Sequence, residues 1–164
     1  MLNKVIHFQR RMGFGEPLGL QKTSEQSKVS FDSLVDHNAK EKAIHVVEKP
    51  ELDPTQMRNS EESLKKVFQK SRQETLKLNY AWMEQMIKPE FSIREKMTFF
   101  WHDHFACRSR VAYLAQQQNN TIRKNALGSF ADLLMAVSKD PAMIQFLNNQ
   151  QNKKDSPNEN FARE

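Results

Sequence analysis

A long stretch between Pro54 and Pro89 contains neither glycine nor proline, and it constrains the fold more than any other feature of the chain. It begins as Asp-Pro-Thr-Gln, in which Asp53 can cap a helix and Pro54 can occupy the first helical position. Positions suited to one buried face recur in steps of three and four: Leu64, Phe68, Ser71, Thr75, Leu78, Trp82 and Met86. The spacing predicts one amphipathic helix over residues 54–88, about 50 Å long.

The rest of the chain also favours helices. Glycine and proline are scarce, with 4 and 6 residues among 164, and apolar residues recur at helical spacing in several further segments. We therefore expect an all-α fold, an irregular array of about six to eight helices in a single helical region over residues 1–164. Residues 21–30 and 43–53 break the pattern and are interpreted as linkers or loops.

Residues 96–108, KMTFFWHDHFACR, concentrate unusual chemistry. Ser92 and Glu95 predict a capping box at the start of a helix through this stretch. Five of its residues share one helical stripe: Met97, Phe100, Trp101, His104 and Phe105. We therefore expect His104 to be a core histidine and His102 to be exposed or at a second interface. Because a helix turns by about 100° per residue, the two imidazoles point about 160° apart, so no metal site is assigned to them.

Two more helix starts are predicted near the end of the chain. Asp140 is followed by Pro141, and Ser156 by Pro157, so each pair can cap and begin a helix. Cys107 is the only cysteine, so no internal disulfide can form, and we interpret it as a small packing residue.

Charge and hydropathy restrict the partners. The formal net charge of +5 is spread among acidic residues, and the aromatic residues fall on expected core stripes, so nucleic-acid binding is not favoured. No apolar run is long enough to span a membrane, and residues 1–15 do not resemble a secretion signal. A cytoplasmic location is the default expectation.

Three stretches carry a resemblance to a known family: HFQRRMGFG at residues 7–15, REKMTFFWHDHFA at 94–106, and NALGSFADLLMAVSKDPAMIQFLNNQQNKKDSPNENFARE at 125–164. In this order they resemble the N-terminal part of the bacterial family catalogued as domain of unknown function 1800. The resemblance implies that the chain is an N-terminal fragment of a larger domain, because the sequences of that family continue beyond it. It implies no particular reaction, and it implies that many relatives are exported.

Polar residues within the matching stretches are the candidate site residues, since buried polar groups need partners. They are His102, Asp103, His104, Asn158, Glu159, Asn160, Arg163 and Glu164. In a structural interpretation these side chains bind helix ends and one another. In a functional interpretation a histidine, His102 or His104, meets Glu159 or Glu164 as a general base and its orienting partner, or these residues are ligands of a metal ion that the missing remainder completes. Asp103, Asn158, Asn160, Arg163 and Glu164 are the candidate binding residues.

Two functions therefore stay open, and the sequence assigns no cofactor. One is a hydrolytic or metal-dependent enzyme of which this chain is the N-terminal part. The other is a helical protein-protein interaction or structural module without catalysis. Its partner would be a second copy of the chain or a missing C-terminal portion.

Overall fold

The computed structural model describes residues 7, 10–14, 32, 35–36, 39–50, 61–154 and 156–163. Its elements with defined bounds are α4 (Glu61–Met86), η2 (Pro89–Phe91), α5 (Ser92–His104), α6 (Ala112–Asn125), α7 (Phe130–Ser138), α8 (Pro141–Phe146), η3 (Asn149–Gln151) and α9 (Asn160–Arg163). No residue in these ranges forms a strand, and the one β-bridge, between Lys153 and Ser156, is isolated. The all-α prediction is therefore confirmed.

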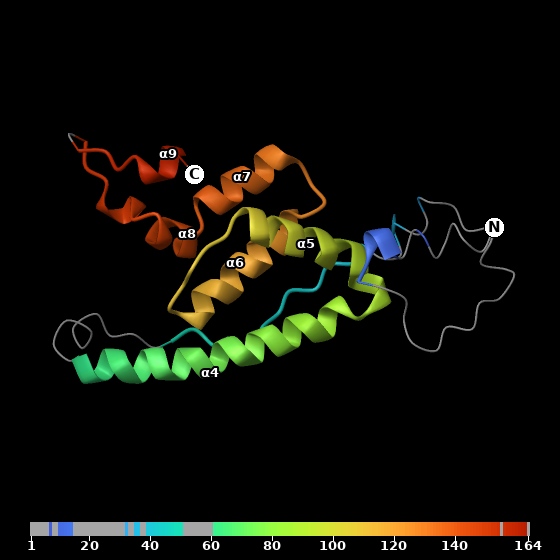
Figure 1. The fold of residues 1–164 in the computed structure, drawn as a ribbon, viewed down its shortest axis with the longest axis horizontal. Coiled ribbons are helices and arrows are strands. Elements are labelled where there is room, and N and C mark those ends of the chain that lie inside the picture. The colour runs from blue at the N-terminus through green and yellow to red at the C-terminus, as the bar shows by residue number, and fades with distance from the viewer. Residues whose placement is uncertain are drawn as a thin grey trace, which may run out of the picture.

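Helix α6 is the central element. It packs against α4, α5, α7 and α8. Figure 1 shows α4 along one long edge of the molecule and α7, α8 and α9 on the opposite side, with α6 between them. This arrangement leaves one face of α4 and one face of the α7–α9 group turned away from α6.

Helix α4 covers 26 residues, which corresponds to about 39 Å. It ends at Met86 instead of Lys88, because Pro89 opens the 3-10 turn η2. The expected start at residues 54–60 lies outside the described part.

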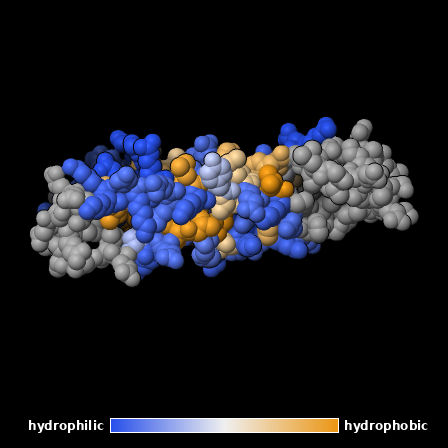
Figure 2. All heavy atoms as spheres, turned by 90° about the horizontal axis from the view of Figure 1, so that it is seen from below, coloured by the Kyte–Doolittle hydropathy of each residue, from blue (hydrophilic) through white to orange (hydrophobic). Residues whose placement is uncertain are grey.

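The buried side of α4 is more polar than the pattern predicted. From residue 65 onward, its buried residues are Ser71, Leu78 and Gln85, one every seven positions. On other faces of α4 Leu76 and Met83 are exposed, and Ile87, directly after the helix, is 73% exposed. Figure 2, seen from the α4 side, accordingly shows apolar atoms interrupting a hydrophilic surface.

Helix α5 buries a different face from the predicted one. Its buried residues are Ile93, Glu95 and Thr98, whereas Phe99 and Phe100 are half exposed. The predicted capping box is also wrong: the N-cap residue is Phe91, whose side chain makes no capping hydrogen bond. The physical reason is that the Glu95 carboxylate turns inward to an arginine of α6 instead of back to the helix terminus.

The main apolar core lies where α6, α7 and α8 meet. Ile122, Leu133 and Val137 are at most 2% exposed there, and Met143 and Leu147 complete the cluster. The predicted cap of α8 is confirmed, because the Asp140 carboxylate accepts hydrogen bonds from the backbone N–H groups of Ala142 (2.9 Å) and Met143 (3.2 Å).

Residues 39–50, called the strap below, run without regular secondary structure beside α4 and α6 (Figure 1). Ile44 and Val47 of the strap form a second apolar cluster with Leu78 of α4 and Ala112 of α6. The strap includes residues 43–50 of the predicted loop. The predicted loop residues 51–53 and the linker 21–30 lie outside the described part of the chain.

The last helix begins later than predicted. Helix α9 starts at Asn160, not at Pro157, and the Asn158 side-chain oxygen accepts a hydrogen bond from the Asn160 N–H (3.1 Å). Asn158 therefore provides the capping interaction that the pattern assigned to Ser156.

Candidate functional site

A buried ion pair joins α5 to α6. The Arg123 guanidinium donates from Nε to one oxygen of Glu95 (2.7 Å) and from Nη2 to the other (3.1 Å), and both residues are fully buried. The same carboxylate accepts hydrogen bonds from the Trp82 indole (2.7 Å) and the Gln85 amide (2.8 Å) of α4. A buried charge pair is tolerable because each charge is neutralised and each polar atom is bonded.

The remaining arginine donors are also used. Arg123 donates to the side-chain oxygens of Asn119 (2.5 Å) and Asn120 (2.6 Å) on its own helix. We call Trp82, Gln85, Glu95, Asn119, Asn120 and Arg123 the polar hub. Because the hub satisfies its two charges internally, its arrangement is that of a structural clamp, and it fixes the rotation of α5.

Fixing the rotation of α5 decides where the two histidines point. His102 lies edge-on to the Trp82 ring, with centroids 5.2 Å apart and planes at 87°. Its Nδ1 atom is buried and has no hydrogen-bond partner among the described residues. Burial lowers the pKa of His102, although the adjacent Asp103 carboxylate acts in the opposite direction. His102 is therefore neutral at pH 7, with its exposed neighbour Asp103 turned to solvent.

His104 is exposed, so its assignment as a core histidine is wrong. Its ring stacks parallel to Phe100 (6.5 Å, 5°) and lies edge-on to Phe105 (4.9 Å) and Trp101 (5.7 Å). Phe130 of α7 extends the same cluster through Trp101, at 5.7 Å. Of the stripe predicted for the core, Trp101 and Phe105 are partly buried against the main core, whereas His104 and one side of Phe105 line a surface feature. The cause is the polar hub, because its hydrogen bonds to Glu95 turn the Glu95 side of α5 towards the interior.

That surface feature is an apolar groove of about 460 Å³ between the end of α5 and helices α7, α8 and α9. We call it the α7 groove, and its lining residues are His104, Phe105, Ala106, Leu134, Met135, Val137, Ser138, Met143, Phe146, Leu147 and Phe161. Leu134, Met135 and Phe146 stay 44–55% exposed on its walls. Such a concave apolar surface is typical of a binding site.

The polar residues before and within α9 bond mainly to local groups. Asn158 donates from Nδ2 to the carbonyl of Leu147 (2.9 Å), which follows α8. Arg163 donates to the side-chain oxygen of Asn160 (3.2 Å), while Glu159 is exposed. Glu164 lies outside the described residues.

The structure brings only some of the candidate residues together. His104 shares the α7 groove with Phe161, so α5 and α9 do meet at one surface. Within the described chain, no hydrogen bond or ion pair joins His102 or His104 to Glu159. No group of three or more histidine, cysteine, aspartate or glutamate side chains in that part could hold a metal ion.

Cys107 lies next to the groove and is half buried against the main core. Burial raises the pKa of the Cys107 thiol to about 11, although a hydrogen bond with Gln118 acts in the opposite direction. The thiol is protonated at neutral pH, as expected for a packing residue.

Sequence reasoning did not predict that Leu134, Met135 and Phe146 form the exposed apolar wall of a groove. A signal was present: the helix FADLLMAVS is apolar on more of its circumference than one buried face requires. Such a helix is either enclosed by the fold or covered by something else.

Comparison with known proteins identifies the family but no individual relative. Neither the curated proteins nor the solved structures gave a match to this chain. None of the described helices is both long enough and apolar enough to cross a membrane. The family model described as "Protein of unknown function (DUF1800)" matches residues 7–164, which is almost the whole chain and includes all three resembling stretches. The chain belongs to this family.

Proposed function

We propose that the protein is a helical interaction module whose α7 groove receives the apolar face of a helix from another polypeptide. The observation that carries the proposal is the groove itself, because large apolar side chains from α7, α8 and α9 line about 460 Å³ of open concave space. Leaving such side chains in water costs free energy, which a partner recovers by covering them.

A helix fits the walls of this groove. They are side chains on α7 and α8, and such walls accept apolar residues spaced three and four apart on a partner helix. A second copy of the chain is the competing occupant of the groove. The oligomeric state of the purified chain distinguishes self-association from binding of another polypeptide.

The test uses a matched pair of leucines. Leu134→Asp places a charge in the groove, whereas Leu76→Asp places one on the exposed face of α4, and both leucines are about half exposed. The probe is a synthetic amphipathic helix with a leucine stripe and Glu and Lys elsewhere. Burying one leucine contributes about 1.5–3 kcal/mol, so Leu134→Asp should weaken binding about ten- to a hundredfold.

Calorimetry or fluorescence anisotropy measures this affinity. Leu76→Asp should bind the probe as the unsubstituted chain does. Equal affinities for the two variants, or no binding by the unsubstituted chain, would reject the proposed groove.

The enzyme alternative is favoured by one observation, the exposed imidazole of His104 in the groove. In that case His104 would act as a general base on a substrate with an apolar portion. His104→Ala should then abolish hydrolysis of an apolar ester such as p-nitrophenyl butyrate. The interaction module predicts that no such hydrolysis occurs above the uncatalysed rate.

A further inference from the structure

Helix α4 has an exposed apolar face opposite the face that it buries. Leu76, Tyr80, Met83 and Ile87 recur in steps of four, three and four, and they are 56–73% exposed. The Ile87 N–H donates to the Met83 carbonyl (3.3 Å), so the helical spacing continues past the end of α4. At about 100° of turn per residue, these four residues lie about 140–180° around the helix from the buried Leu78. We call them the α4 stripe.

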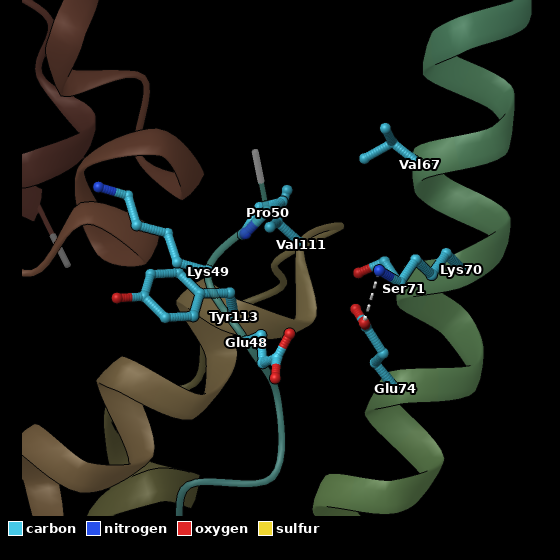
Figure 3. Close-up of a pocket in the computed structure, with 9 residues that line it drawn as sticks. All are labelled: Glu48, Lys49, Pro50, Val67, Lys70, Ser71, Glu74, Val111 and Tyr113. Atoms are coloured by element: carbon cyan, nitrogen blue, oxygen red, sulfur yellow. Dashed lines mark ion pairs between the residues drawn. The ribbon is translucent and has the colours of Figure 1, made fainter. Parts of the chain in front are cut away.

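The α4 stripe is turned away from the described elements that pack on α4. Figure 1 shows α4 as the outermost labelled helix on its side of the molecule, with α5 and α6 on its inner side. Figure 3 shows part of that inner side, where Val67, Ser71 and Glu74 line a cavity of about 320 Å³ together with residues 48–50 of the strap. The α7 groove lies beyond α6, on the opposite side of the molecule.

The spacing of the α4 stripe is that of a seam between two helices. Steps of four and three are the steps between the a and d positions of a heptad, which interlock with the same positions of a second helix. Tyr80 and Ile87 take the a positions, and Leu76 and Met83 take the d positions.

Two copies of the stripe fit each other when the helices run antiparallel. In that orientation each a position meets a d position of the second helix. Tyr80 then packs on Met83 of the second copy, and Leu76 packs on Ile87 of the second copy. A two-fold axis between them repeats both contacts, and an aromatic ring beside a thioether is a favourable pair.

The charges beside the stripe favour the same arrangement. Lys77 and Glu84 take the two e positions, and both are exposed. In the antiparallel pair Lys77 of each copy faces Glu84 of the other, which gives two symmetric ion pairs. A parallel pair would instead bring Arg72, at a g position, against Lys77 of the second copy, and these charges repel.

We propose that two copies of the chain associate through the α4 stripe as an antiparallel, two-fold symmetric pair of helices. The occupant is a second copy because one axis satisfies the apolar pairs and the charge pairs together. Four apolar side chains per chain make an interface smaller than the standard size of about 800 Å² per partner, so the dimer dissociates on dilution. The α7 groove, on the opposite side, stays accessible in this dimer.

Sedimentation equilibrium between about 1 μM and about 1 mM should show a monomer–dimer equilibrium. Tyr80→Asp places a charge in the seam twice per dimer and should weaken dimerisation at least about tenfold. Leu134→Asp, in the α7 groove, is the matched control and should dimerise as the unsubstituted chain does. A monomer at every concentration overturns the proposal. A dimer that Leu134→Asp abolishes and Tyr80→Asp preserves also overturns it, because self-association would then use the α7 groove.

Charge reversal tests the antiparallel orientation. Lys77→Glu and Glu84→Lys should each weaken dimerisation about tenfold, because two ion pairs per dimer become repulsive. Mixing these two variants should restore association as a heterodimer, in which opposite charges face each other again. Both positions are exposed, so the variants should fold, which circular dichroism checks. A mixture that associates no more tightly than the separate variants overturns the proposed pairing.

Discussion

Glu95 and Arg123 control the orientation of α5. Both are fully buried and bonded to each other through two hydrogen bonds, so neither charge meets water. The sequence favoured a local role for Glu95, as the acid of a capping box. The arginine that pairs with Glu95 lies 28 positions later, outside the reach of local patterns. Local spacing cannot reveal such a pairing, and the error placed Phe100 and His104, which are exposed, in the core.

Removing one charge of this pair should be severe. Glu95→Gln leaves a buried, uncompensated arginine, and breaking a buried pair in this way costs about 3–5 kcal/mol of unfolding free energy. Glu84→Gln, at an exposed glutamate of α4 paired with Lys88, should change stability by less than about 1 kcal/mol. Urea denaturation measures both. A Glu95→Gln midpoint within error of the unsubstituted protein would show that the hub is not a clamp.

His102 should make stability depend on pH. Burial lowers its pKa in the folded state, so below pH 6.5 the unfolded chain binds more protons than the folded chain does. The free energy of unfolding should therefore fall as the pH drops from 7.5 towards 5. The fall should be smaller in His102→Asn than in the unsubstituted protein. In His104→Asn it should be unchanged. Urea midpoints at the two pH values provide the measurement, and an identical fall in all three proteins would contradict it.

At the scale of elements, the sequence predicted those helices whose ends and apolar faces are encoded locally. The Asp140-Pro141 start of α8 is confirmed because the cap, the proline and the first turn are neighbours in the chain. The start of α9 was misplaced because two residues can cap the same turn, and Asn158 binds both the turn and the end of α8. The strap contacts could not be predicted, since Gln116 lies 69 positions from Val47.

The cap of α8 gives a prediction at this scale. Asp140→Ala removes two hydrogen bonds from the first turn and should cost about 0.5–2 kcal/mol of unfolding free energy. Asp132→Ala, at an exposed aspartate in the first turn of α7, should cost less. Thermal denaturation of the two variants compares them directly. A larger loss in Asp132→Ala than in Asp140→Ala would contradict the assigned cap.

At the scale of the whole molecule, the hub and the groove are two sides of one arrangement. Glu95 of α5 accepts hydrogen bonds from residues of α4 and α6. With α5 held in this rotation, His104 and its aromatic neighbours face α7, α8 and α9. The sequence shows that the two histidines face different ways, because helical geometry alone requires it. It does not show which one faces inward, because that depends on the ion pair with Arg123.

The central claim, that the α7 groove is the binding surface, can be tested with the methionines of the chain. Met135 and Met143 line the groove, whereas Met83 is exposed on α4 outside it. In a methyl-labelled protein titrated with the amphipathic helix, the NMR signals of Met135 and Met143 should shift saturably while that of Met83 stays in place. Shifts at Met83 without shifts at Met135 and Met143 would contradict the account.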